Sequence, residues 1–169
     1  EANQTVLVNG GSLIEDADSA IVSLNGGKYI IQNAELNKNY KHIVVKNYNG
    51  THPGTIEKSN LYCRNYPTMS NATLLSPYPA NTRTSIGIDI REVQSIQVGN
   101  DASLVLKNNF RNMGIGIRSI KSNLISYNNY FTNIQNPNPL NTCKGCDCAI
   151  GTGICAVGIK LPANTLTVG

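Results

Sequence analysis

A four-residue phrase recurs along this chain: Ile or Val, any residue, Ile or Val, and then a basic residue. Its copies lie at 43–46, 88–91, 115–118 and 157–160, with a degenerate copy at 20–23. Most copies alternate apolar with other residues, the pattern of a β-strand that has one buried face. Neighbouring copies are 22 residues apart at Ile21 and Ile43, and 27 apart at Ile88 and Ile115. Repetition at such an interval predicts a solenoid, in which each repeat adds one coil.

Asparagine is the second informative feature, with 24 copies among 169 residues. It gathers between the repeated phrases, where its tolerance of left-handed backbone and its side-chain amide favour tight corners. In a coil, such amides can also stack on those of the next coil. Leu36, Phe110 and Phe131 lie among these asparagines and are expected to point inward. The alternative is a disordered Asn-rich tract, but the regular apolar alternation argues against it.

Composition agrees with a β-rich core. Hydrophobic residues make up 40% of the chain, with no Trp and two Phe, so Ile, Val and Leu must fill the interior. No apolar run reaches the ~18 residues of a membrane-spanning helix, and no signal segment is recognisable at the start. Neither end carries a polar cap, which a solenoid needs. We therefore expect a single domain over 1–169 that is part of a longer protein.

Segments 11–21, 26–33, 39–43 and 106–117 resemble the right-handed parallel β-helix repeats of secreted bacterial proteins. The resemblance implies an all-β chain, a right-handed parallel β-helix (β-solenoid) of about five to seven coils. Two stretches, near 51–83 and 134–153, do not fit the repeat and are expected to be inserted loops. In that family, such repeats occur in polysaccharide lyases and hydrolases, in adhesins and in surface proteins without known chemistry. The resemblance also implies a secreted or cell-surface location.

Stacking the phrases in register would place their basic residues in one outward-facing column: Lys46, Arg91, Arg118 and Lys160. Strands in a sheet lie about 4.8 Å apart, so these like charges would repel one another unless anions intervened. The column is therefore a candidate site for acidic polysaccharide or a negatively charged cell surface. The alternative is an ordinary solvated face, since the formal net charge is only +4.

The first inserted stretch is rich in tyrosine, with Tyr62, Tyr66 and Tyr78. Loops on a rigid scaffold often carry function, and tyrosine rings can stack on the apolar faces of sugars. The alternative is that these rings pack locally between the loop and the coils.

Four of the five cysteines follow the second insertion or lie within it: Cys143, Cys146, Cys148 and Cys155. Four thiolates at this spacing could bind zinc or an iron–sulfur cluster, although the spacing is not a standard one. In an oxidising compartment the same residues would form disulfides. The implied secretion favours disulfides and no resident cofactor. Cys63 is then left over or pairs with one of the four.

Catalysis finds little support in the sequence. Glycoside hydrolases need two close carboxylates, and lyases need a basic residue beside an acidic calcium site. Asp89 lies inside one phrase, but the equivalent positions hold Val44, Gly116 and Gly158. We therefore assign no catalytic residue, and calcium only if the chain is a lyase.

The sequence thus predicts a non-catalytic module of a secreted or cell-surface bacterial protein, a rigid spacer or adhesin with possible binding of acidic polysaccharide. The competing prediction is a segment of a polysaccharide lyase or glycoside hydrolase. Uncapped ends would contact the rest of a larger chain or neighbouring subunits. Nucleic acid is not an expected partner, because aromatic residues do not interleave with the basic ones.

Overall fold

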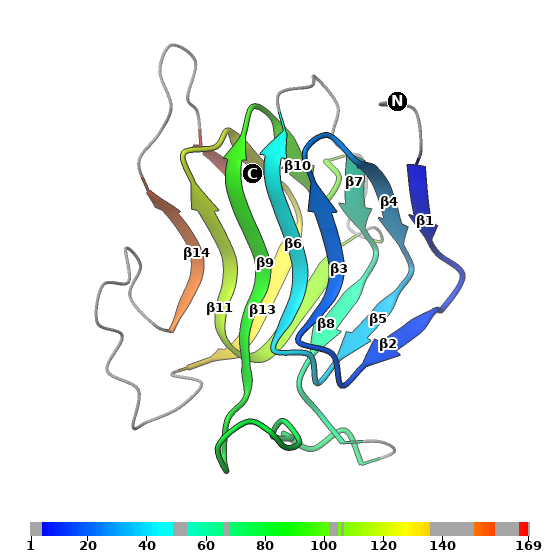
Figure 1. Ribbon diagram of the computed structural model, residues 1–169, viewed down its shortest axis with the longest axis vertical. Coiled ribbons are helices and arrows are strands. Elements are labelled where there is room, and N and C mark those ends of the chain that lie inside the picture. The colour runs from blue at the N-terminus through cyan, green and yellow to red at the C-terminus, as the bar shows by residue number, and fades with distance from the viewer. Residues whose placement is uncertain are drawn as a thin grey trace.

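A computed structural model describes residues 5–48, 54–65, 68–101, 105, 107–135 and 151–157, and the backbone of 166–168. These residues form fifteen β-strands, and no α-helix occurs among them. Every strand pair within the two sheets is parallel (Figure 1). The predicted all-β class with parallel strands is therefore confirmed.

The strands belong to two sheets. The first sheet, in spatial order, contains β1 (Thr5–Val8), β4 (Lys28–Gln32), β7 (Gly54–Glu57), β10 (Ile96–Val98), β12 (Leu124–Ser126) and β15 (Leu166–Val168). The second contains, in spatial order, β2 (Leu13–Glu15), β5 (Glu35–Asn37), β8 (Asn60–Tyr62), β11 (Asn108–Ile120), β9 (Thr84–Val93), β6 (Lys41–Tyr48) and β3 (Ser19–Leu24). Two further strands, β13 (Asn129–Ile134) and β14 (Thr152–Val157), pair with β11.

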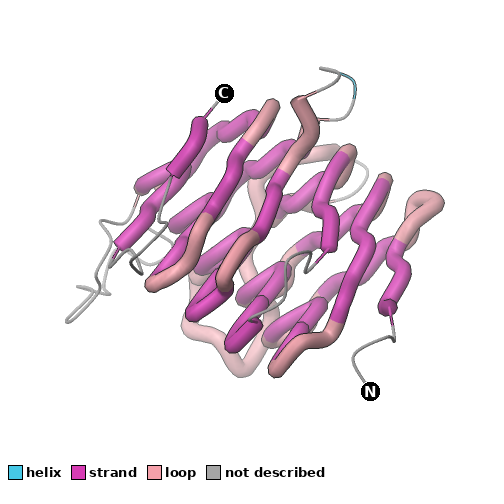
Figure 2. The backbone as a smooth tube through the Cα atoms, turned by 90° about the horizontal axis from the view of Figure 1, so that it is seen from above, coloured by secondary structure: helices cyan, strands magenta, loops and turns pink. Residues whose placement is uncertain are grey.

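The long strand β11 joins two ladders into the second sheet. Its first half pairs with β8 and β13, and its second half pairs with β9 and β14. The chain therefore runs from the first sheet through one ladder of the second sheet and then the other, before it returns to add the next strand. We call each such circuit a pass. Figure 2 shows the strands of successive passes side by side.

Residues of like kind align across the passes and fill the interior. One file contains Ile21, Ile43, Ile88, Ile117 and Ile154, each in register with the next. The three central members are completely buried. Burying such a side chain contributes about 1.5–3 kcal/mol. The copies of the phrase at 43–46, 88–91 and 115–118 each supply one of these fully buried residues.

A second inner file closes one corner and contains Ile14, Leu36, Leu61, Phe110 and Phe131. Leu36 and Phe110 are fully buried, and Phe131 packs against the same core. The two phenylalanine rings stack, with centroids 4.8 Å apart and planes inclined by 22°. The inward orientation expected for these residues is confirmed.

The corners explain the abundance of asparagine. Residues with positive φ occupy equivalent corners of successive passes, for example Asn25 (54°), Asn47 (56°) and Glu92 (55°). Asparagine adopts this left-handed backbone more readily than most residues. Amide side chains also bond across passes, since Asn47 donates to Asn25 Oδ1 at 3.3 Å. Backbone geometry and side-chain pairing therefore favour the same residue at these positions.

The predicted register is correct for the first phrases and wrong for Arg118. Lys46 lies opposite Arg91, as expected, but Arg118 lies opposite Asp89, and Arg91 lies opposite Ile120. The third phrase is displaced by two residues because glycines set the alignment. A Cβ on Gly87 would lie 2.8 Å from the Phe110 ring and 2.5 Å from the carbonyl oxygen of Gly116.

The predictions for the last phrase and for the inserted loops also need correction. The copy of the phrase at 157–160 was expected to be a strand, but Val157 is the last residue of β14. Residues 54–57 and 60–62 form β7 and β8, so the first insertion is shorter than expected and covers 63–83, between β8 and β9. The second insertion separates β13 from β14, and most of it lies outside the described residues.

Candidate functional site

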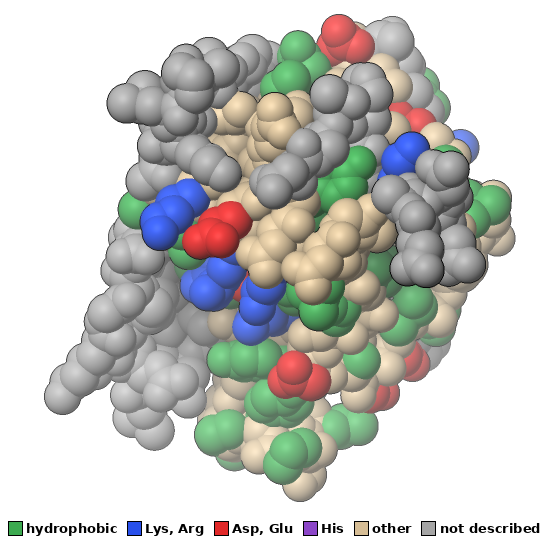
Figure 3. All heavy atoms as spheres, turned by 45° about the horizontal axis from the view of Figure 1, so that its top comes forward, with side chains coloured by type: hydrophobic (Ala, Val, Ile, Leu, Met, Phe, Trp, Pro, Cys, Tyr) green, Lys and Arg blue, Asp and Glu red, His purple; other side chains and the backbone are tan. Residues whose placement is uncertain are grey.

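A cluster of charged side chains lies on the outer face of β6, β9 and β11. Arg118 binds Asp89 through two hydrogen bonds, from Nε to Oδ1 at 2.9 Å and from Nη2 to Oδ2 at 2.7 Å. Arg91 donates from its Nε to the same Oδ1 at 3.2 Å. Lys46 lies opposite Arg91 on the neighbouring strand. We call Lys46, Asp89, Arg91 and Arg118 the basic patch. A space-filling view shows basic and acidic side chains gathered on the molecule's surface (Figure 3).

The strands explain why these side chains meet. On β9, Ile88 and Ile90 belong to the core, so alternation turns Asp89 and Arg91 to the opposite face. Asp89 is nevertheless fully buried, and its neighbour on β6, Val44, is 4% exposed. The side chain of Arg118 is 14% exposed and that of Arg91 is 39% exposed. The patch is therefore built around a buried carboxylate, and Arg91 is the more accessible of its two arginines.

The charge state of Asp89 follows from two opposed effects. Burial alone would raise the pKa of this carboxyl group, because a low-dielectric environment disfavours the anion. Hydrogen bonds from Arg118 and Arg91 outweigh burial and hold the pKa of Asp89 below its usual value. Asp89 is therefore ionised at neutral pH. With three cations around one anion, the patch has a net charge of +2.

The structure thus brings together three of the four basic residues predicted from the sequence, although not in one column. Lys46 and Arg91 are direct neighbours. Arg118 joins them through Asp89, which the sequence indicated only as an isolated carboxylate inside one phrase. Lys160 lies outside the described residues.

The tyrosines of the first insertion make intramolecular contacts. Tyr62 is 8% exposed, and the guanidinium carbon of Arg64 lies 3.8 Å from its ring centroid. Tyr78 stacks on Tyr40 with centroids 4.9 Å apart and donates a hydrogen bond to Asp18 at 2.7 Å. These contacts correspond to the local-packing alternative. Tyr66 lies outside the described residues.

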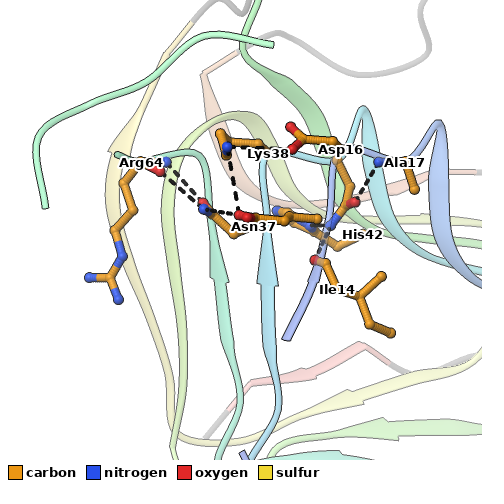
Figure 4. A network of polar contacts seen from close by, with 9 residues as sticks. Ile14, Asp16, Ala17, Asn37, Lys38, His42 and Arg64 are labelled. Carbon is orange, nitrogen blue, oxygen red and sulfur yellow. Dashed lines mark hydrogen bonds and ion pairs between the residues drawn. The ribbon is translucent and has the colours of Figure 1, made fainter. Parts of the chain in front are cut away.

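A polar network at the corner between β5 and β6 was not anticipated (Figure 4). Asn37 accepts a hydrogen bond from the backbone N–H of Arg64 at 3.0 Å and donates to the Arg64 carbonyl oxygen at 3.0 Å. It also donates to Glu15 at 3.0 Å. Lys38 forms ion pairs with Asp16 at 3.5 Å and with Glu15 at 3.6 Å. The network therefore joins three successive passes.

The same corner holds a buried histidine. Asn39 accepts from the N–H of Ala17 at 2.9 Å, donates to the Ile14 carbonyl oxygen at 2.9 Å and lies 3.2 Å from Nδ1 of His42. Burial lowers the pKa of His42 to about 3, against a smaller opposing effect of the Tyr62 backbone. His42 is therefore neutral at physiological pH. The short spacing of Asn37 and Asn39 was the sequence signal for this corner.

A groove of about 490 Å³ lies along the first sheet. Its lining includes Lys28, Ile30, Thr55, Gln97 and Ile125. Ile30, Thr55, Gln97 and Ile125 come from neighbouring strands in register. Lys28 is the one charged residue among the described residues of this lining, so the groove is less suited to a polyanion than the basic patch.

Of the predicted cysteine cluster, only Cys155 lies within the described residues, on β14 opposite Arg118. Cys143, Cys146 and Cys148 lie outside them. Cys63 is a free, buried thiol. Within the described part of the chain, no group of three or more His, Cys, Asp or Glu residues could hold a metal ion.

The strand neighbours of Asp89 are Val44 and Arg118, so no second carboxylate stands beside it in the ladder. The patch can hold an anion, but it does not pair two carboxylates for acid–base hydrolysis. Among the described residues, no helix is long and apolar enough to cross a membrane.

Comparison with known proteins adds no family: no protein-family model, no curated protein and no solved structure matches the chain.

Proposed function

We propose that the chain forms a right-handed parallel β-helix. Three observations support this: all ladders are parallel, each pass adds one strand to each ladder in turn, and aliphatic files run continuously through the interior. A ladder of this kind is stiff, because each pass is bonded along its length to its neighbours.

On this scaffold, we propose a non-catalytic module of a secreted or cell-surface bacterial protein that binds acidic polysaccharide through the basic patch. The observation that carries the proposal is the pair of guanidinium groups fixed on the buried carboxylate of Asp89. Two arginines and a lysine held close together repel one another, and an incoming anion relieves that repulsion. Because Asp89 already orders the arginines, their side chains lose less conformational entropy when an anion binds.

The patch keeps donors for a ligand. Asp89 accepts from Nε and Nη2 of Arg118 but only from Nε of Arg91. Neither the terminal nitrogens of Arg91 nor Lys46 Nζ forms a hydrogen bond or ion pair within the described residues. Carboxylates along a uronic-acid polymer can accept from both.

The experiment is calorimetric titration of the protein with polygalacturonate at low ionic strength. We expect binding that weakens as salt is added, because exposed charges are screened. Arg91→Ala and Lys46→Ala should each weaken binding, about five- to tenfold for a charge-assisted contact of roughly 1 kcal/mol or more. Lys28→Ala removes the same charge from the first sheet and should leave binding unchanged. Binding that survives both patch changes would rule out the patch, and loss in Lys28→Ala would point to the groove instead.

The competing proposal, a segment of a polysaccharide lyase or glycoside hydrolase, gains no specific support from the described residues. It predicts cleavage of the polymer during prolonged incubation. Release of new reducing ends or unsaturated products, lost on changing a named carboxylate such as Asp89, would establish it.

For the cysteine cluster, we propose disulfides in an oxidising compartment, with zinc or an iron–sulfur cluster as the alternative. The proposal of a secreted or cell-surface location rests, like the proposed disulfides, on the resemblance to the β-helix repeats of secreted proteins. Mass measurement with and without reductant distinguishes these states, since a bound metal is lost to a chelator and a disulfide is not.

A further inference from the structure

Asp89 accepts two hydrogen bonds from one arginine and one from another. Arg118 occupies both oxygens, through Nε and Nη2, in a side-on pair with distances of 2.9 and 2.7 Å. Arg91 reaches only Oδ1, through its Nε at 3.2 Å. The Nε atoms of both guanidinium groups are therefore turned toward the same carboxylate.

This arrangement leaves different edges of the two guanidinium groups available. Arg118 uses both Nε and Nη2 to bind Asp89, and its side chain is 14% exposed. Arg91 holds Asp89 by Nε alone and its side chain is 39% exposed, and its two terminal nitrogens form no hydrogen bond or ion pair among the described residues. Two parallel N–H groups on a planar fork match the two oxygens of a carboxylate, whereas an ammonium group lacks this geometry.

We propose that Asp89 is a positioning residue of the anion site, and that it orients the planar fork of Arg91 so that the two terminal N–H groups of Arg91 bind two oxygens of one anionic group. The inference rests on the proposed function. Asp89 holds the fork of Arg91 in one orientation, and Lys46, one strand away, adds a non-directional charge. Arg118 completes the support by neutralising and orienting the buried carboxylate.

The proposal makes a prediction opposite in sign to simple charge attraction. Asp89→Asn removes a negative charge and raises the net charge of the patch from +2 to +3. If charge alone governed affinity, every polyanion would bind this variant more tightly. If Asp89 positions Arg91, carboxylate polymers bind it more weakly despite the added charge.

The test compares two probes, polygalacturonate and dextran sulfate, in calorimetric titrations at one salt concentration. We expect Asp89→Asn to weaken the binding of both polymers, polygalacturonate about tenfold, despite the added positive charge. Tighter binding of both polymers would overturn the proposal. If the native protein binds neither polymer, the proposed function itself fails, so the two failures are distinguishable.

Because Asp89 is buried, its replacement could unfold the chain, and a second variant avoids that problem. Arg91→Lys keeps the charge at a partly exposed position and removes only the planar fork. We expect it to weaken the binding of both polymers about as much as Asp89→Asn does. Arg83→Lys makes the same change on a partly exposed side chain outside the patch, so it is the matched control and should not weaken either. Equal affinity of native protein and Arg91→Lys for polygalacturonate would contradict the proposal, whatever the fate of Asp89→Asn.

Discussion

The ring of Phe131 on β13 lies directly against the backbone of Gly116 on β11, where any side chain would overlap it. A Cβ at Gly116 would collide with the edge of that ring and would lie 2.5 Å from the carbonyl oxygen of Gly153. One pass earlier, a Cβ on Gly87 would likewise collide with the ring of Phe110. These contacts make the glycines of β9 and β11 part of the core packing.

Gly116→Ala should therefore destabilise the protein by about 1–3 kcal/mol, the usual cost of inserting a methyl group into a packed core. Urea denaturation measures the change. Gly27→Ala is the control, since its Cβ would lie 3.3 Å from the hydroxyl of Ser23 and 3.9 Å from the carbonyl oxygen of Leu24, with no ring against it. We expect a change within about 0.5 kcal/mol. Equal effects at the two positions would show that the ring contact is unimportant.

Stability should fall as the pH drops below 6.5, because His42 is buried and neutral. The unfolded chain takes up a proton near pH 6.5, whereas burial lowers the pKa of His42 in the folded state to about 3. Between these values the unfolded state binds more protons, so the free energy of unfolding falls by roughly 1 kcal/mol per pH unit. Thermal melts from pH 7 to pH 4.5 measure this fall.

His42→Gln should flatten that dependence, and His52→Gln, which removes the other histidine of the chain, should preserve it. Asp89 contributes to stability over a different pH range. Because its pKa is lowered in the folded state, its stabilisation is present above the unfolded value of 3.8 and is lost only at lower pH. A pH dependence above 4.5 that persists in His42→Gln would contradict this assignment.

Asn112 should be among the most sensitive polar positions. It is fully buried, has φ of 59°, accepts from Asn133 at 3.0 Å and donates to the carbonyl oxygens of Cys63 and Ala72. Asn112→Ala loses these bonds and also replaces asparagine, which tolerates left-handed backbone, by a residue that tolerates it less. We expect a loss of about 2–4 kcal/mol in chemical denaturation.

Asn112→Gly separates the two effects. It also removes the side chain, but glycine adopts positive φ without strain. We expect it to be about 1 kcal/mol more stable than Asn112→Ala and still clearly below the native protein. A glycine variant as stable as the native chain would show that the amide bonds contribute nothing net.

Tyr78→Ala should lower stability without weakening polygalacturonate binding. The ring stacks on Tyr40 and its hydroxyl group binds Asp18, so its removal should cost about 1–2 kcal/mol. Burial and Asp18 raise the pKa of Tyr78 to about 12, which ultraviolet titration can follow. Loss of polymer binding in a variant that remains folded would instead establish the tyrosine loop as a ligand surface.

Cys63 should resist alkylation in the native protein. Its thiol is completely buried, bonds to the Ala72 carbonyl oxygen at 3.4 Å and has a pKa raised by burial, all of which lower the thiolate population that reacts. Mass spectrometry after iodoacetamide treatment should show this cysteine modified only on denaturation. Rapid labelling of Cys63 in the folded protein would contradict the described environment.

Much of the architecture could be read from the sequence, but the site could not. The alternation around Ile43 and Ile88 predicted inward-facing strands, and the asparagines marked the corners. The predicted register of Arg118 was wrong because matching the basic residues of the two phrases places Arg118 opposite Arg91, whereas Arg118 lies opposite Asp89. The glycine shared by Ile86-Gly87-Ile88 and Ile115-Gly116-Ile117 was the better signal.

Side-chain direction in a strand has a period of two residues, so a slip by two leaves every apolar residue on its original face. The sequence by itself therefore determined which residues face inward and where the chain turns, since these depend on local pattern and backbone preference. Which residues are neighbours across passes depends on contacts between distant segments, and the stacking of Phe110 and Phe131 over glycine decided it. Only the tertiary structure could thus place Arg118 on Asp89 and turn a supposed row of cations into a cluster around a buried anion.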